Sequence, residues 1–144
     1  MSDSSPLPPS IARVLDRFAV MGRDEKMQSL VAYAKKLEPL PPHLAELDRT
    51  PFTVPECQTR VDLFPEVGDG KLHFYADVNV RQSPTIAAFL SIVFAAVNGE
   101  PPATTLAIPD DFVPRMMHGL GLSAREMGLN AMVVRLKRHA RDAQ

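Results

Sequence analysis

The chain has 144 residues, of which 45% are hydrophobic, and this is enough to build the core of one domain. Its formal net charge is −1 and its pI is about 6.4, so charge does not favour binding to nucleic acid or to an acidic membrane. Trp is absent and aromatic residues make up only 6%, which argues against a surface for base stacking. We therefore expect neither nucleic acid nor a membrane among its partners.

The N-terminal sequence, MSDSSPLPPS, has neither the basic region nor the apolar region of a signal peptide. The longest apolar run, residues 86–97, is shorter than the roughly 20 residues that cross a bilayer. The single cysteine excludes an internal disulfide and is typical of a reducing compartment. We expect a cytoplasmic protein with a flexible lead, residues 1–9, and a single domain, residues 10–141.

Apolar residues recur at helical spacing near the N-terminus. A first helix is predicted to be capped by Ser10 and to end at Gly22. Its apolar face comprises Ile11, Val14, Leu15 and Phe18. A second helix is predicted over residues 24–37, because acidic residues at its start and lysines at its end complement the helix dipole. The proline-rich residues 39–42 end it.

The middle of the chain predicts a β-hairpin. Residues 59–64 and 71–78 alternate between apolar and polar side chains on either side of Gly68-Asp69-Gly70. The segments that follow are a buried helix over residues 84–97, short helical turns within residues 101–117 and a long amphipathic helix from Ser123. Strands and helices are segregated, so the predicted class is α+β, with a small antiparallel sheet of about three strands packed against helices.

Cys57 is the only residue with evident chemistry. It precedes the predicted hairpin on a loop, and loops carry binding and catalytic residues disproportionately often. A lone cysteine is nevertheless more often a small buried apolar residue. Arg60 and Arg125 are candidate cations that would favour the reactive thiolate, whereas the charge of Glu56 opposes it. From the residues alone, both interpretations of the thiol stay open.

Other chemistries find less support in the sequence. If the hairpin turn centres near Gly68, Cys57 faces about residue 80. His73 then lies about 20 Å along the strand from that residue, too far for a Cys–His pair. Nothing ties His43 or His118 to the thiol, and His139 lies on a polar helix end. One cysteine and four scattered histidines have no metal-ligand spacing, and an iron–sulfur scaffold needs several thiolates. Glycine-rich nucleotide motifs are also missing. We therefore expect no metal and no cofactor.

Several segments, in this order and at these spacings, resemble the SufE family, the partners of cysteine desulfurases. The resemblance covers about residues 10–140. Its landmarks are EKMQSLVAYAKKLEPLP, VPECQTRV, GKLHFYAD, the apolar helix ending in Asn98-Gly99, LAIPDDF and SAREMGLNAMVVRLKRHA.

The resemblance implies a SufE/IscU-like α+β fold and a sulfur acceptor for iron–sulfur cluster assembly. Cys57 would accept persulfide sulfur from a SufS-like cysteine desulfurase, stimulate that enzyme and pass the sulfur to a SufBCD-like scaffold. The pyridoxal phosphate belongs to the desulfurase, so this chain would be a persulfide carrier rather than a self-standing enzyme. Whether it is a monomer or a homodimer stays open.

The resemblance also assigns roles to residues around the thiol. Gln58 matches the family's glutamine and is expected to shape the thiol loop. Asp77 matches an acidic position at the end of the second hairpin strand, and Arg125 an arginine at the start of the last helix. With Arg60, these residues are expected to support the loop or a partner.

The sequence departs from the family pattern at several positions. Glu56 stands where many relatives have Gly, and Leu120 where they often have His. Residues 77–80 read Asp-Val-Asn-Val where relatives often have Asp-Ser-Asp-Ala. Two alternatives therefore stay open, namely a binding module of the same fold that has lost sulfur transfer and a thiol-dependent enzyme that uses Cys57.

Overall fold

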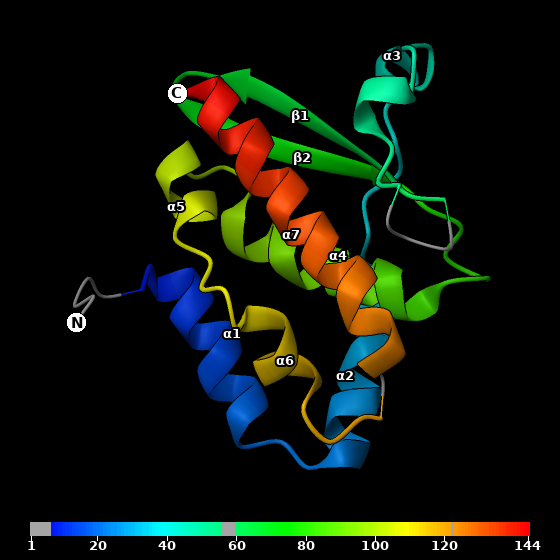
Figure 1. Ribbon diagram of the computed structural model, residues 1–144, viewed down its shortest axis with the longest axis vertical. Coiled ribbons are helices and arrows are strands. Elements are labelled where there is room, and N and C mark those ends of the chain that lie inside the picture. Colours follow the sequence, from blue (N-terminus) through cyan, green and yellow to red (C-terminus); the bar gives the residue numbers. More distant parts are fainter. Residues whose placement is uncertain (1–6, 56–59, 122) are drawn as a thin grey trace.

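The computed structural model describes residues 7–55, 60–121 and 123–144, the first two residues of the last range by their backbone alone (Figure 1). The described elements are, in chain order, α1 (Pro9–Ala19), α2 (Arg23–Ala34), α3 (Pro42–Ala45), the 3-10 helix η1 (Thr50–Phe52), β1 (Asp62–Gly68), β2 (Lys71–Asp77), α4 (Pro84–Val97), α5 (Pro102–Leu106), α6 (Phe112–Met117) and α7 (Ser123–Ala143). Helices flank one hairpin rather than alternate with strands, which confirms the predicted α+β class. The division into a lead and a domain stays a prediction.

Helix α4 forms the centre of the core. Its side chains are almost all apolar and buried, and α1, α2 and β2 pack against it. Pro84 begins the helix at a position where a missing N–H costs no hydrogen bond. Phe89 of α4 meets Phe112 of α6 edge to face, with ring centroids 6.1 Å apart. The predicted buried helix is therefore confirmed at both ends.

The predicted hairpin is present and its turn is tight. Strands β1 and β2 pair antiparallel from Asp62 opposite Asp77 to Gly68 opposite Lys71. The two turn residues, Asp69 and Gly70, have φ of 53° and 74°. Positive φ at both positions is the two-residue geometry that matches the twist of paired strands. The apolar side chains of β2 alternate as predicted and point into the core.

The predicted number of about three strands was wrong, because the described residues form a sheet of two. The turn after α4 occupies the free edge of β2 instead. The Phe74 N–H donates to Asn98 Oδ1 at 2.8 Å, and Asn98 Nδ2 donates to the Phe74 carbonyl at 3.1 Å. Leu72 exchanges backbone hydrogen bonds with Gly99 and Glu100. These residues satisfy the edge groups that a third strand would otherwise pair.

Helix α7 packs on β1, whereas α4 packs on β2. It packs against β1, α5 and α6, and Figure 1 shows it crossing in front of the hairpin, with its C-terminal end near the hairpin turn. The predicted apolar stripe is buried and comprises Leu129, Met132, Val133, Leu136 and Ala140.

No helix in the described part of the chain combines the length and hydrophobicity needed to cross a membrane.

Candidate functional site

The structure describes both ends of the segment that carries the thiol. Cys57 and Gln58, like Glu56, lie outside the described residues. Before them, the Val54 N–H donates to the Val61 carbonyl at 2.9 Å. The neighbouring Thr53 and Asp62 form an isolated antiparallel bridge. Residues 55–60, here called the Cys57 loop, are therefore closed at their base where β1 begins.

A fully buried carboxylate lies at this base. Asp62 Oδ2 accepts hydrogen bonds from Arg49 Nη1 and from Arg60 Nε, each at 3.3 Å. The Thr53 hydroxyl donates to the other oxygen, Oδ1. A buried carboxylate is tolerated when cations and hydrogen-bond donors replace water in this way. Together with Asp77, these residues form what we call the Arg49 cluster.

Arg49 joins this base to the last residue of the second hairpin strand. Its Nη1 also donates to Asp77, the last residue of β2, and its Nη2 lies 3.4 Å from the Ala45 carbonyl of α3. The Asp77 carboxylate, which accepts this hydrogen bond, raises the pKa of the Arg49 guanidinium above its ordinary value. Asp62 and Asp77 face each other directly in the strand register. One guanidinium therefore bridges two carboxylates that would otherwise repel each other.

The structure brings two of the four supporting residues predicted from the sequence into this cluster. Arg60 binds Asp62, and Asp77 binds Arg49. Arg125 is exposed in the first turn of α7, and the described contacts do not join it to the cluster. Gln58 is outside the described residues. The roles of all four stay predictions.

Sequence reasoning missed Arg49, Thr53 and Asp62. A usable signal was present, because two aspartates opposite each other in a hairpin predict a cation between them. The predicted register did not align them. The predicted register places Tyr75 opposite Asp62, whereas in the structure Asp77, two residues further along β2, lies opposite it.

Of the four histidines, two lie against carboxylates, His139 is partly buried and His118 is exposed. His73 Nε2 lies 2.9 Å from Glu38 Oε1, and His43 pairs with Glu66. His139 has a buried Nε2 without a hydrogen-bond partner, and burial lowers its pKa, with Arg135 acting in the same direction. Among the described residues, no three His, Cys, Asp or Glu side chains are grouped as metal ligands.

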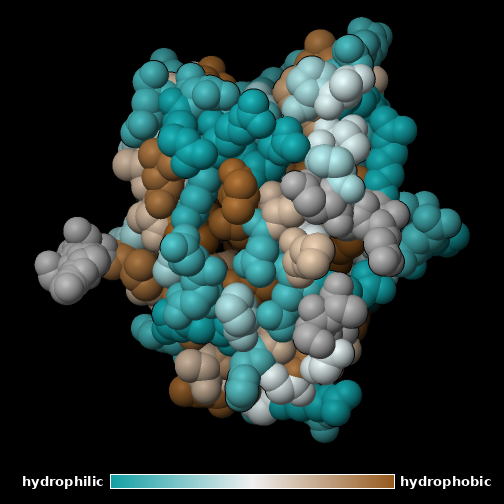
Figure 2. Space-filling view, viewed as in Figure 1, coloured by the Kyte–Doolittle hydropathy of each residue, from teal (hydrophilic) through white to brown (hydrophobic). Residues whose placement is uncertain are grey.

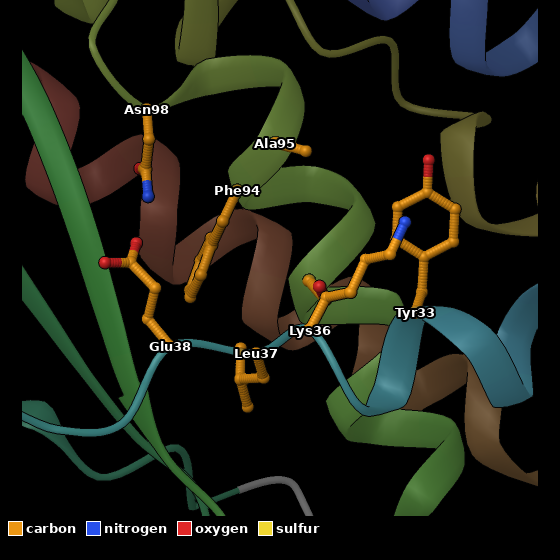
Figure 3. A pocket seen from close by; sticks show the side chains of 8 residues that line it. Tyr33, Lys36, Leu37, Glu38, Phe94, Ala95 and Asn98 are labelled. Carbon is orange, nitrogen blue, oxygen red and sulfur yellow. The ribbon is translucent and has the colours of Figure 1, made fainter.

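A hollow of about 270 Å³ lies between the end of α2 and α4 (Figure 3). Figure 3 shows Lys36 extending toward the ring of Tyr33, and Glu38 and Asn98 on the opposite side of the hollow. The Lys36 ammonium lies 5.0 Å from the Tyr33 ring centroid, Glu38 pairs with His73, and Asn98 binds Phe74. The side chains of Lys36, Glu38 and Asn98 thus have partners within the protein and do not converge on a ligand.

A groove of about 310 Å³ runs beside α7. Its lining includes Phe112, Val133 and Val134, with Lys137 and Arg141 on α7 as its cations. Figure 2 shows hydrophobic surface near the middle of the face that α7 crosses, flanked by hydrophilic surface. Lys137 pairs with Asp110 across the groove at 3.6 Å, so one of the two cations is already neutralised.

The connection before α7 is held by a buried lysine. Lys26 of α2 is only 5% exposed and donates to the His118 carbonyl at 2.8 Å. Two residues further on, Leu120 is 4% exposed and belongs to the core. The departure at this position, where relatives often have His, therefore places an apolar side chain in an apolar environment.

The observations so far define a class of protein: an α+β domain with one thiol in a loop that is closed at the start of a hairpin. Comparisons with known proteins agree with this description. The SufE family model, described as the Fe-S metabolism associated domain, matches residues 12–140. The chain therefore belongs to the SufE family, as its sequence motifs predicted, and has a role in iron–sulfur metabolism.

Individual relatives extend along the whole chain. Two SufE-like proteins of Mycobacterium tuberculosis, from strains CDC 1551 and H37Rv, are each 36% identical to this chain over 151 aligned positions. Each alignment covers 99% of this chain and 99% of the relative. A hypothetical protein from Thermus thermophilus, solved in solution, superposes with a TM-score of 0.77 at 29% identity. That match covers 96% of this chain and 98% of the other.

Proposed function

We propose that the protein accepts sulfur on Cys57 from a cysteine desulfurase and passes it to an iron–sulfur scaffold. The observation that carries this proposal is the closed base of the Cys57 loop in a chain that belongs to the SufE family. The only thiol of the chain lies in that loop. Cys57 is three residues after Val54, so chain length limits the distance between their Cα atoms to about 11 Å. The thiol is thereby tied to a fixed point of the fold.

The transfer is an exchange between a thiolate and a persulfide. The Cys57 thiolate attacks the outer sulfur of the desulfurase persulfide, and a new S–S bond forms at Cys57. The S–S bond on the desulfurase breaks, and its cysteine leaves as a thiolate with the bonding electrons. The sum of oxidation states does not change, so the step needs no external oxidant or reductant. A second exchange of the same kind releases the sulfur to the scaffold.

Thiolate–persulfide exchange requires one accessible nucleophile and a surface on which the desulfurase docks. A second thiol close to Cys57 would resolve the persulfide to a disulfide and release the sulfur early. The chain has no second thiol. The proposed partners are thus a SufS-like desulfurase, which supplies its own pyridoxal phosphate, and a scaffold that receives the sulfur.

Desulfurase turnover tests the proposal. Alanine formation from cysteine is measured with an active SufS-like desulfurase, with the wild-type chain and with Cys57→Ser. The wild-type chain should accelerate turnover, and Cys57→Ser should bind the desulfurase without accelerating it. Equal stimulation by both proteins would instead identify a binding module that does not transfer sulfur. Consumption of peroxide by the chain alone, lost in Cys57→Ser, would identify a thiol-dependent enzyme.

A further inference from the structure

We propose that Arg49 is a positioning residue for sulfur transfer, which holds the base of the Cys57 loop in the geometry that transfer requires. This inference rests on the proposed function. Its basis is that one guanidinium contacts the end of the loop, the end of the hairpin and α3. These contacts go to Asp62, Asp77 and the Ala45 carbonyl, respectively.

Arg49 controls both ends of the loop. On the entry side, its own carbonyl accepts the Thr53 N–H at 3.1 Å, so it fixes the turn of η1 that leads into the loop. On the exit side, its guanidinium binds Asp62, the residue after Val61. The Thr53 hydroxyl links the two sides of the loop by donating a hydrogen bond to Asp62. The entry contact is made by the backbone and persists without the side chain, whereas loss of the guanidinium releases the exit side at Asp62 and its links to Asp77 and α3.

The hydrophobic core holds the two ends of the loop through Val54 and Val61, but it does not join them to Asp77 and α3 as Arg49 does. Strand β1 packs on α7 and β2 on α4, while η1 packs against β1 and brings Phe52 near His139 of α7. From η1, Phe52 reaches the ring of Phe64 with centroids 4.6 Å apart. Beside this aromatic contact, the backbone bridge and the buried Val54 and Val61, the Arg49 cluster connects the loop entry to the hairpin by polar contacts. Removing the cation should loosen the loop base while the packing around α4 persists.

The site also has the surface exposure that a docking partner needs. The side chains of Arg49 and Asp77 are 25% and 44% exposed, while Asp62 beneath them is buried. The cluster therefore extends from the interior to the surface. A desulfurase that docks at the thiol meets a loop whose base is already ordered, so less ordering entropy opposes the transfer step.

Single-turnover sulfur uptake tests this inference. A desulfurase preloaded with persulfide is mixed with increasing concentrations of the chain, and sulfur on Cys57 is followed by mass spectrometry. Each variant gives a maximum rate and a half-saturating concentration. Arg49→Met removes the charge but keeps an unbranched side chain, and Arg49→Lys keeps the charge but loses the planar fork. Arg115→Met is the matched control, because Arg115 makes only an exposed pair with Asp111.

Arg49→Met should lower the maximum rate about tenfold, because misplacement of a reacting group slows the step itself. Its half-saturating concentration should change less than about twofold, a split between rate and affinity that loss of folded protein does not produce. Arg49→Lys should recover part of the rate, and Arg115→Met should match the wild type. Asp77→Asn, on a partly exposed side chain, should lower the maximum rate in the same way if Arg49→Met fails to fold.

Two results would overturn the inference. One is a maximum rate for Arg49→Met within twofold of the wild-type value. The other is a half-saturating concentration that rises by at least as large a factor as the maximum rate falls, which would make Arg49 a binding residue rather than a positioning residue. If the wild-type chain itself takes up no sulfur, the proposed function fails instead, so the two failures are distinguishable.

Discussion

Arg49 Nη1 lies 3.3 Å from Oδ2 of Asp62, and this contact neutralises the most deeply buried carboxylate described in the fold. Asp62→Ala should lower the free energy of unfolding by about 2 kcal/mol, because the substitution leaves the partly buried Arg49 guanidinium and Thr53 hydroxyl without their acceptor. Urea denaturation provides the measurement. Asp111→Ala breaks an exposed pair with Arg115 and should cost less than about 0.5 kcal/mol. Equal losses for the two variants would contradict this view of Asp62.

Asn98 replaces a neighbouring strand at the edge of β2, so its removal should destabilise the hairpin. Asn98→Ala leaves the N–H and the carbonyl of Phe74 without their partners in a partly buried place. Two lost hydrogen bonds predict a decrease of about 2 kcal/mol in the free energy of unfolding, measured by urea denaturation. Asn79→Ala, which removes one hydrogen bond in an exposed turn, should cost less than half as much. A smaller loss for Asn98→Ala than for Asn79→Ala would exclude this role.

Lys26 connects α2 to the turn that precedes α7, and hydrogen exchange can detect this connection. Lys26→Met keeps the aliphatic stem of the side chain but loses the hydrogen bond to the His118 carbonyl. The Leu120 N–H, which donates to the Met117 carbonyl in the same turn, should then exchange about tenfold faster, because the turn opens more often. Exchange within α4 should not change. An unchanged rate at Leu120 would show that the turn holds without Lys26.

His139 makes the stability depend on pH. Burial, followed by the charge of Arg135, lowers its pKa, so the unfolded chain binds the proton more readily than the folded chain. The resulting stabilisation is complete above the unfolded pKa of about 6.5 and is lost as the pH falls below it. His139→Leu should therefore reduce the decrease in melting temperature between pH 7.5 and pH 5.

Phe52→Leu is the control for His139, because the Phe52 ring lies 6.2 Å from the imidazole and does not titrate. This variant should lower the melting temperature at each pH without changing the pH dependence. A decrease between pH 7.5 and pH 5 that is as large in His139→Leu as in the wild type would rule out His139 as its source.

The elements predicted best were those fixed by local chemistry. Ser83-Pro84 and Asn98-Gly99 mark the ends of α4, and the Asp69-Gly70 turn sets the hairpin. Proline geometry and positive φ leave few alternatives at these positions. The strand count failed for a non-local reason. Asn98 and its neighbours occupy the edge of β2. Sequence periodicity cannot predict that a side-chain amide pairs with a strand edge in the place of another strand.

The candidate site was predictable only in part. Motifs identified Cys57 and its family, and they drew attention to Arg60 and Asp77. They missed Arg49 because it is separated from Asp62 and Asp77 in the sequence and because the segment around it has no helical or strand periodicity. Long-range charge pairing depends on the register of the hairpin. A shift of two positions was enough to hide the two facing aspartates.

Intact-protein mass spectrometry tests the central claim most directly. The chain is incubated with an active cysteine desulfurase, pyridoxal phosphate and cysteine, without reductant, beside a Cys57→Ser control. We expect a mass gain of at least one sulfur atom that maps to Cys57, disappears on reduction and is absent from Cys57→Ser. No gain with a desulfurase that demonstrably produces alanine, or an equal gain in Cys57→Ser, would contradict the claim that this chain carries sulfur on Cys57.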